Sequence, residues 1–180
     1  MHKMKITLSL ILSLTFLSSG IVMAESLKEI NYRGGVVKFK IPSNWKEEYE
    51  ENGGGTFYED APDTGTLRLN IITTQAPPDV KGNLPVQALS GISGVDQKNI
   101  EMLANGNALA HAVQRSEEQG TKITIYLWYL ANHMPPNYVR MANYSYTILT
   151  SKENDKQTKA ELELLEEQIK NAVFHPELGK

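Results

Sequence analysis

Alternation between hydrophobic and polar positions predicts β-strands along most of the chain after residue 24. In the first half, the alternation marks four short strands, at 29–33, 36–41, 56–60 and 66–74. Three segments typical of tight turns lie between them: Gly34-Gly35, 52–55 and 61–65, the last with Gly65 available for a positive φ. Three hairpin-like links in succession indicate an antiparallel sheet.

The second half of the chain has the most regular strand pattern. Three strands are expected at 108–117, 122–131 and 138–150, joined by turns at 118–121 and 133–137. The last two strands are rich in isoleucine, tyrosine, tryptophan and threonine, which pack well on a pleated surface. We therefore expect three consecutive antiparallel strands here.

Two helices are expected beside the strands. Asn83 can cap a short helix that runs to about Leu89, with Pro85 tolerated in its first turn. A long C-terminal helix is expected near 153–174, because apolar positions recur there at helical spacing. This order of elements predicts an α+β fold, with an antiparallel sheet of about six strands flanked by helices.

Residues 1–24 have the three parts of a secretory signal peptide. Lys3 and Lys5 give a positive start, and an uncharged, leucine-rich stretch follows. Small and medium residues then precede a cleavage site between Ala24 and Glu25. The uncharged stretch is also just long enough to span a bilayer as an uncleaved anchor, although its serines, threonines and glycine favour cleavage.

Cleavage would leave a single soluble domain, 25–180, in the periplasm or outside the cell. No later stretch is apolar and long enough to span a membrane, since 123–131 is the longest candidate. The whole chain has 18 basic and 21 acidic residues and a net charge of −3. This balance argues against nucleic-acid binding, which usually needs a large positive excess.

The composition also limits the chemistry. The chain has no cysteine, which excludes disulfides, thiolate metal sites and a thiol nucleophile. His111, His133 and His175 are too dispersed to form a metal-binding motif, and no Gly-x-Ser-x-Gly motif of a serine hydrolase is present. The acidic residues near Pro62 are explained by the turn itself. We therefore expect no cofactor, no metal and no enzymatic activity.

Several short motifs resemble the PsbP/DcrB-like superfamily. The run Gly-Val-Val-Lys-Phe-Lys-Ile-Pro-Ser-Asn-Trp at 35–45 is similar to the family's opening strand, proline and tryptophan. Tyr-Thr-Ile at 146–148 and Ala-Val-Phe at 172–174 follow in the family's order. The resemblance covers residues 30–175 and implies a central antiparallel sheet between helices, an α/β/α sandwich. It also implies a role in binding other proteins, usually without catalysis, but no partner-binding residue can be carried over.

One face of the sheet stands out as a candidate site. We pair the strand at 122–131 with the strand at 138–150 so that the numbers of two opposite residues add up to about 270. The strand at 108–117 is paired with 122–131 in the same way, with a sum of about 237. Tyr126 then faces Tyr144, and His111 faces Tyr126. Alternation gathers one set of side chains on this face, with Arg140 toward its rim: Leu109, His111, Tyr126, Trp128, Tyr144 and Tyr146. The opposite face has small residues, and we assign the C-terminal helix to it.

Two interpretations of the aromatic face remain open. It could be a recess that binds a peptide, a glycan or a partner loop, with Arg140 holding a carboxylate. It could instead be core, covered by the first-half strands or the short helix. The expected function is that of an exported, non-enzymatic protein that binds a protein or envelope component, with an immunity or assembly role. The alternative is a periplasmic carrier or sensor that holds a small ligand in an aromatic pocket.

Overall fold

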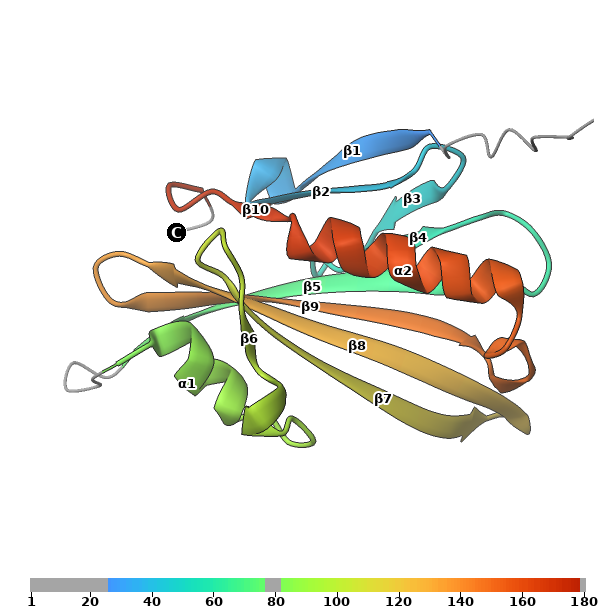
Figure 1. The fold of residues 1–180 in the computed structure, drawn as a ribbon. Helices are drawn as coiled ribbons and strands as arrows, with labels where there is room; N and C mark the ends of the chain where they lie inside the picture. Colours follow the sequence, from blue (N-terminus) through green and yellow to red (C-terminus); the bar gives the residue numbers. More distant parts are fainter. Residues whose placement is uncertain (1–25, 77–81, 179–180) are drawn as a thin grey trace, which may run out of the picture.

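The computed structural model describes residues 26–76 and 82–178. The expected signal peptide, with Ala24 and Glu25 at its cleavage site, lies outside these residues. Two antiparallel sheets lie one above the other (Figure 1). The smaller sheet has the order β1 (Leu27–Tyr32), β2 (Val37–Pro42), β10 (Val173–Phe174).

The larger sheet has seven strands. In spatial order they are β3 (Lys46–Tyr49), β4 (Gly55–Tyr58), β5 (Thr66–Gln75), β9 (Tyr138–Leu149), β8 (Thr121–Met134), β7 (Ala108–Glu118) and β6 (Glu101–Met102). All the expected strands form, but β3, β6 and β10 were not expected. The expectation of one sheet was also wrong, because the chain leaves the smaller sheet at Pro42 and starts the larger one at Lys46.

Two α-helices lie against the larger sheet. The short helix α1 (Leu84–Ser90) begins as expected, since the Asn83 side chain accepts a hydrogen bond from the Val86 amide at 3.0 Å. The last helix, α2 (Lys156–Lys170), has fifteen residues and is shorter than expected. It ends because the chain turns at Asn171 and then forms β10 on the smaller sheet.

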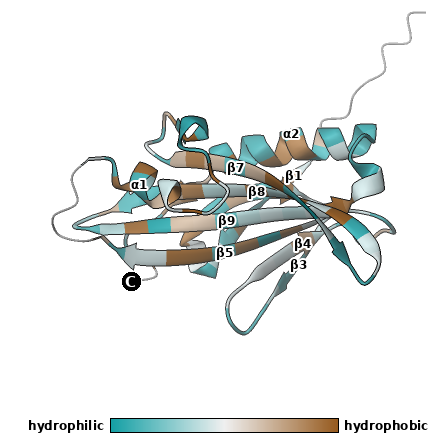
Figure 2. Ribbon diagram, turned by 90° about the horizontal axis from the view of Figure 1, so that it is seen from below, coloured by the Kyte–Doolittle hydropathy of each residue, from teal (hydrophilic) through white to brown (hydrophobic). Residues whose placement is uncertain are grey.

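The two helices lie on opposite faces of the larger sheet, and the expectation for α2 was wrong. Leu165 and Ile169 of α2 pack in the main core with the aromatic face and the inner side of β2. The small-residue face instead carries α1 (Figure 2). Leu89 of this helix packs among Ala108 and Ala110. Small side chains let a short helix approach closely, whereas the aromatic face needed the larger cover of α2 and the smaller sheet.

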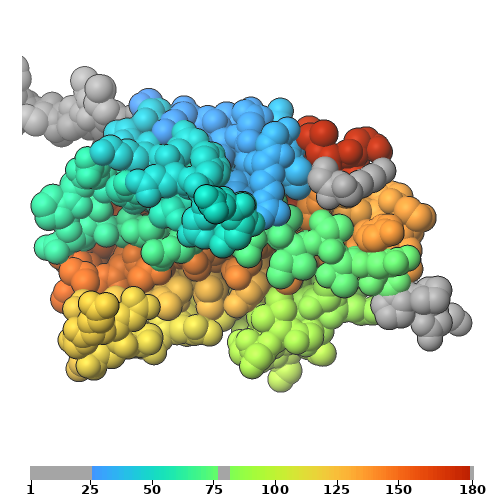
Figure 3. Space-filling view, turned by 180° about the vertical axis from the view of Figure 1, so that it is seen from behind, coloured from blue at the N-terminus to red at the C-terminus, as the bar shows by residue number. Residues whose placement is uncertain are grey.

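The β7–β8 hairpin projects from the rest of the molecule. In the view from behind, its yellow tip stands apart from the green segment that contains α1 (Figure 3). Across the two described ranges, no helix is long and apolar enough to cross a membrane.

Candidate functional site

The register of the central strands is two residues away from the one expected. Trp128 lies opposite Tyr144, and Tyr126 lies opposite Tyr146. His111 lies opposite Trp128. Because side chains alternate with a period of two, a shift by two residues keeps every residue on its expected face. The six candidate residues therefore share one face of the sheet, as predicted.

Four of the six residues, Leu109, Trp128, Tyr144 and Tyr146, are buried in the core. Tyr144 and Tyr146 have no exposed surface, and Trp128 is only 4% exposed. The Tyr144 ring meets the Phe39 ring of β2 edge to face at 5.3 Å, and the Tyr146 ring stacks on Trp45 at 6.1 Å. First-half strands thus cover this part of the face, and it cannot serve as an open recess.

The Tyr146 hydroxyl is held from the side of α2. It donates a hydrogen bond to the Glu161 carboxylate. Burial and this carboxylate raise the pKa of Tyr146, because both disfavour a negative phenolate. Tyr146 is therefore a neutral structural hydrogen-bond donor that links β9 to α2.

Arg140 anchors the C-terminal segment. Its side chain is completely buried and donates hydrogen bonds to the Thr73 hydroxyl at 3.2 Å, to the His175 carbonyl at 2.8 Å and to the Leu178 carbonyl. Burial lowers the pKa of its guanidinium. The Arg140 guanidinium was expected to hold a carboxylate ligand, but in the structure it binds the chain's own carbonyl groups.

His111 and Tyr126 are the candidate residues that reach the surface. His111 is exposed on β7, and Tyr126 is partly buried, with its ring stacked on Trp128 at 6.4 Å. Burial raises the pKa of the Tyr126 hydroxyl. Both residues lie on the outer part of the larger sheet, so the accessible part of the predicted site is next to β7.

The outer edge of β7 has no neighbouring strand along most of its length. The two-residue strand β6 pairs only with Ala108 and Leu109. Among the described residues, no strand pairs with the outer side of positions 110–118, which we call the β7 edge (Figure 1). At about 3.3 Å per residue this edge is ~30 Å long. It presents unpaired backbone groups that can accept another strand.

The side chains of the β7 edge are mostly uncharged. Val113, near its middle, is 49% exposed. The charge of Arg115 is matched by Glu153, whose carboxylate accepts hydrogen bonds from the guanidinium at 2.9 and 3.0 Å. Hydrogen bonds to its carboxylate hold the pKa of Glu153 below its ordinary value. The bonds from Arg115 have the larger effect, and the bond from Thr124 adds to it. The other charged residues of the edge, Glu117 and Glu118, lie at the hairpin tip, where Glu117 is opposite Lys122 of β8.

The opposite edge of the sheet is built differently. The edge strand β3 has only four residues, Lys46-Glu47-Glu48-Tyr49, and three of them are charged. Short, charged edge strands are a common way to prevent unwanted strand pairing. The β7 edge is longer and lacks this protection, which marks it as the candidate interaction surface. Sequence reasoning missed Val113 and Arg115, because it predicted neither β3 nor which strands lie at the edges of the sheet.

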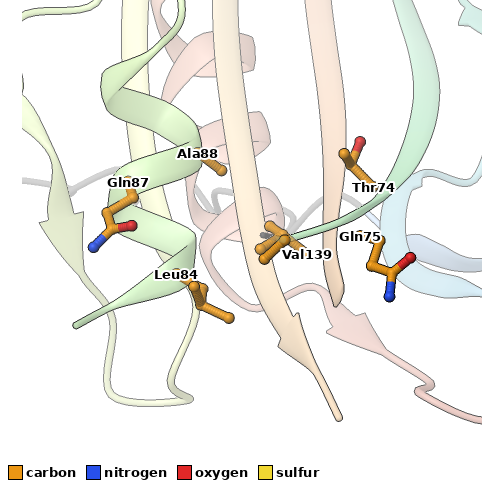
Figure 4. A pocket seen from close by; sticks show the side chains of 7 residues that line it. Thr74, Gln75, Leu84, Gln87, Ala88 and Val139 are labelled. Carbon is orange, nitrogen blue, oxygen red and sulfur yellow. The ribbon is translucent and has the colours of Figure 1, made fainter. Parts of the chain in front are cut away.

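A cavity of about 250 Å³ lies beside α1 (Figure 4). Its lining side chains come from α1 and from the ends of β5 and β9: Thr74, Gln75, Ala76, Leu84, Gln87, Ala88 and Val139. None of the six candidate residues lines it, and its lining has no ionisable side chain. This cavity is therefore not the aromatic pocket expected for a ligand carrier.

A second, open hollow lies between β2 and the C-terminal end of α2. Lys38, Lys40, Glu29, Glu167 and His175 are among its lining residues. Opposite charges are mixed across this surface, so it favours neither an anion nor a cation. Within the described parts of the chain, no three histidine, aspartate or glutamate side chains are placed to hold a metal ion.

Comparisons with known proteins identify the fold. No protein-family model matches the sequence, and the search of curated proteins found no match. Among solved structures, a protein from Bacteroides thetaiotaomicron matches with a TM-score of 0.57 and 20% identity, over 85% of this chain and 50% of that one. LpqN of Mycobacterium tuberculosis, involved in cell envelope biogenesis, matches with a TM-score of 0.54 and 12% identity, over 78% of this chain and 83% of its own.

The chain therefore spans half the length of the Bacteroides protein and most of LpqN. The Ran-binding protein Mog1p of Saccharomyces cerevisiae matches with a TM-score of 0.49 and 11% identity, over 84% of this chain and 96% of its own. A PsbP protein from Synechocystis is also a neighbour, at a TM-score of 0.37. The first two proteins share this architecture, and at 20% and 12% identity the likeness concerns the fold alone.

Proposed function

We propose that this chain is an exported protein that acts by binding another protein chain, and that the partner docks on the β7 edge. The observation that carries this proposal is the long, unpaired edge of positions 110–118, which has no charged side chain between Ala110 and Gln114. An extended segment of a partner can continue the sheet there through main-chain hydrogen bonds. Such binding needs no bond-making chemistry.

The side chains of the edge suit such a partner. Val113 offers an apolar contact at the centre, and His111 can donate or accept a hydrogen bond beside it. The core behind them, from Trp128 to Tyr144, keeps β7 in place when a partner binds. A rigid edge loses little conformational freedom on binding, which favours affinity.

The likeness to LpqN supports a place in the cell envelope, since that protein is described as involved in envelope biogenesis. An assembly role, or immunity against a toxin, fits an exported binding protein of this size. Export itself is tested by the mass of the mature protein. Cleavage between Ala24 and Glu25 gives a chain that starts at Glu25, whereas an intact N-terminus contradicts cleavage.

A carrier function has weaker support. The cavity beside α1 is about 250 Å³, slightly below the range of about 300–1,000 Å³ that is usual for ligand pockets. Its lining also has no charged side chain that could fix the orientation of a ligand. For these reasons we favour protein binding over ligand transport.

The proposal is tested by site-specific photo-cross-linking in the producing cells. A photoreactive amino acid replaces His111 on the β7 edge or, as the control, Glu48 on the opposite edge strand β3. We expect a protein adduct in the envelope fraction from position 111 and little from position 48. Equal yields at both positions, or no adduct at position 111, would contradict docking on the β7 edge.

A further inference from the structure

We infer that the chain docking on the β7 edge is a second copy of this protein. This inference rests on the proposed function, because it names the partner for the same edge. Two copies would be related by a two-fold axis, so that each edge pairs antiparallel with the same edge of the other copy. The length of the edge and the order of its charges both fit this pairing.

The space beside β6 sets where an added strand can begin. β6 already occupies the positions next to Ala108 and Leu109, so a new strand starts opposite position 110. A two-fold axis at Gln114 places position 118 of the second copy opposite position 110. The turn at Gln119-Gly120 of that copy then falls where β6 begins. The unpaired edge of each copy is thereby covered along its whole length.

The charges agree with the same register. With Gln114 opposite its own copy, His111 faces Glu117 of the second copy, and each such pair can form a hydrogen bond. Val113 faces Arg115 of the second copy, whose stem offers an apolar surface and whose charge is already matched by Glu153. No like charges lie directly opposite one another.

The neighbouring registers are less favourable. Registers change in steps of two, because side chains must stay on their own face of the sheet. One step in one direction places Arg115 opposite Arg115 of the second copy, and like charges directly opposite are destabilising. One step in the other direction drives the end of the added strand into β6 and sets His111 opposite Arg115. Of these three registers, the one centred on Gln114 is therefore the most favourable.

The absence of cysteine in the chain allows a clean test of this register. In the Gln114→Cys variant, the two new thiols would lie directly opposite each other, with Cβ atoms about 5 Å apart. A disulfide needs about 3.5–4.5 Å between its Cβ atoms, so a small shift of the two strands is enough for it to form. After mild oxidation we expect several-fold more covalent dimer than from the control variant Glu48→Cys on β3.

A second pair of variants separates charge from simple disruption. In the Val113→Lys variant, the new lysine of each copy would lie opposite Arg115 of the other copy, so two pairs of like charges would form. In the Val113→Glu variant, a carboxylate would lie opposite Arg115 instead. We expect the dimer dissociation constant, measured by sedimentation, to rise at least about tenfold for the lysine variant. For the glutamate variant we expect a change of less than about threefold. Circular dichroism checks that both variants stay folded.

The inference is overturned if the wild-type protein sediments as one chain at every concentration and Gln114→Cys gives no more covalent dimer than Glu48→Cys. If position 111 still cross-links to a different protein in cells, the proposed function stands and only the identity of the partner is wrong. If nothing cross-links at position 111, both proposals fail.

Discussion

Trp128 and His111 lie opposite each other on one face of the same sheet, yet they belong to two different regions. Trp128 lies on the inner strand β8, which together with β9 is covered by β2 and α2. His111 lies on the outer strand β7, where this cover has ended. The inner region is buried and stabilises the fold, whereas the outer region is exposed. A residue's role on this face therefore depends on what lies above it, rather than on its chemistry alone.

The largest expected effect tests this contrast within the cross-strand pair. Trp128→Ala removes a buried ring and leaves a cavity, so we expect the free energy of unfolding to fall by about 3–5 kcal/mol. His111→Ala should change it by less than about 0.5 kcal/mol, as is usual at exposed positions. Urea denaturation measures both values. Similar losses for the two variants would contradict the division into two regions.

Arg140 belongs to the inner region, because it holds the C-terminal segment. Arg140→Met removes the hydrogen bonds to the carbonyls of His175 and Leu178, and we expect a loss of about 2 kcal/mol or more. The same variant should make the segment after Phe174 more sensitive to proteases. Unchanged stability and unchanged cleavage would show that this anchor is dispensable.

The two inner tyrosines should differ from each other. The Tyr144 hydroxyl is buried, with no hydrogen-bond partner among the described residues, whereas the Tyr146 hydroxyl donates to Glu161. Tyr144→Phe should therefore be neutral or slightly stabilising. Tyr146→Phe should cost about 1–2 kcal/mol. Calorimetry distinguishes these outcomes, and a larger loss for Tyr144→Phe would contradict the hydrogen-bond assignment.

The smallest effect concerns the ion pair behind the β7 edge. The pKa of Glu153 is lowered from 4.5 in the folded protein, so its contribution to stability is present above that value. The contribution disappears as the pH falls through the lowered pKa. The melting temperature of Glu153→Gln should lie below that of the wild type at neutral pH, and the gap should close in acid. The exposed variant Glu163→Gln, as a control, should show no such trend.

Much of the fold was predictable from local patterns. The long strands β7, β8 and β9 show clear alternation, and α1 has a recognisable cap at Asn83. The short strands were not predictable, because β6 and β10 have only two residues each and depend on their neighbours. The charged strand β3 has no apolar alternation to reveal it.

The role of Gly65 shows a similar limit. The expected positive φ occurs at Asp63 of the same turn, with a value of 58°. Gly65 is instead needed for space, since a Cβ atom there would lie 2.1 Å from the Tyr146 ring. A close approach of this kind depends on residues far apart in the sequence, so the turn pattern alone could not indicate it.

The predicted site was correct in its shared face and incomplete in its surroundings. Alternation placed His111, Tyr126 and Trp128 together, because a two-residue error in register does not change faces. Which of them is exposed depends on where β2 and α2 lie, and the sequence has no local signal for that placement. The unpaired β7 edge could not be predicted either. It exists because β6 is short, and the sequence has no local signal for the length of β6.

Amide hydrogen exchange of the purified protein, at low and high concentration, tests the central claim most directly. If the β7 edge pairs with another protein chain, the amides of 110–118 that point away from β8 should exchange quickly at low concentration and more slowly at high concentration. The amides of β3 should not respond to concentration. The same measurement is made on the covalent adduct formed at position 111. If these amides exchange quickly at every concentration and also in the adduct, the claim that the β7 edge pairs with another chain is contradicted.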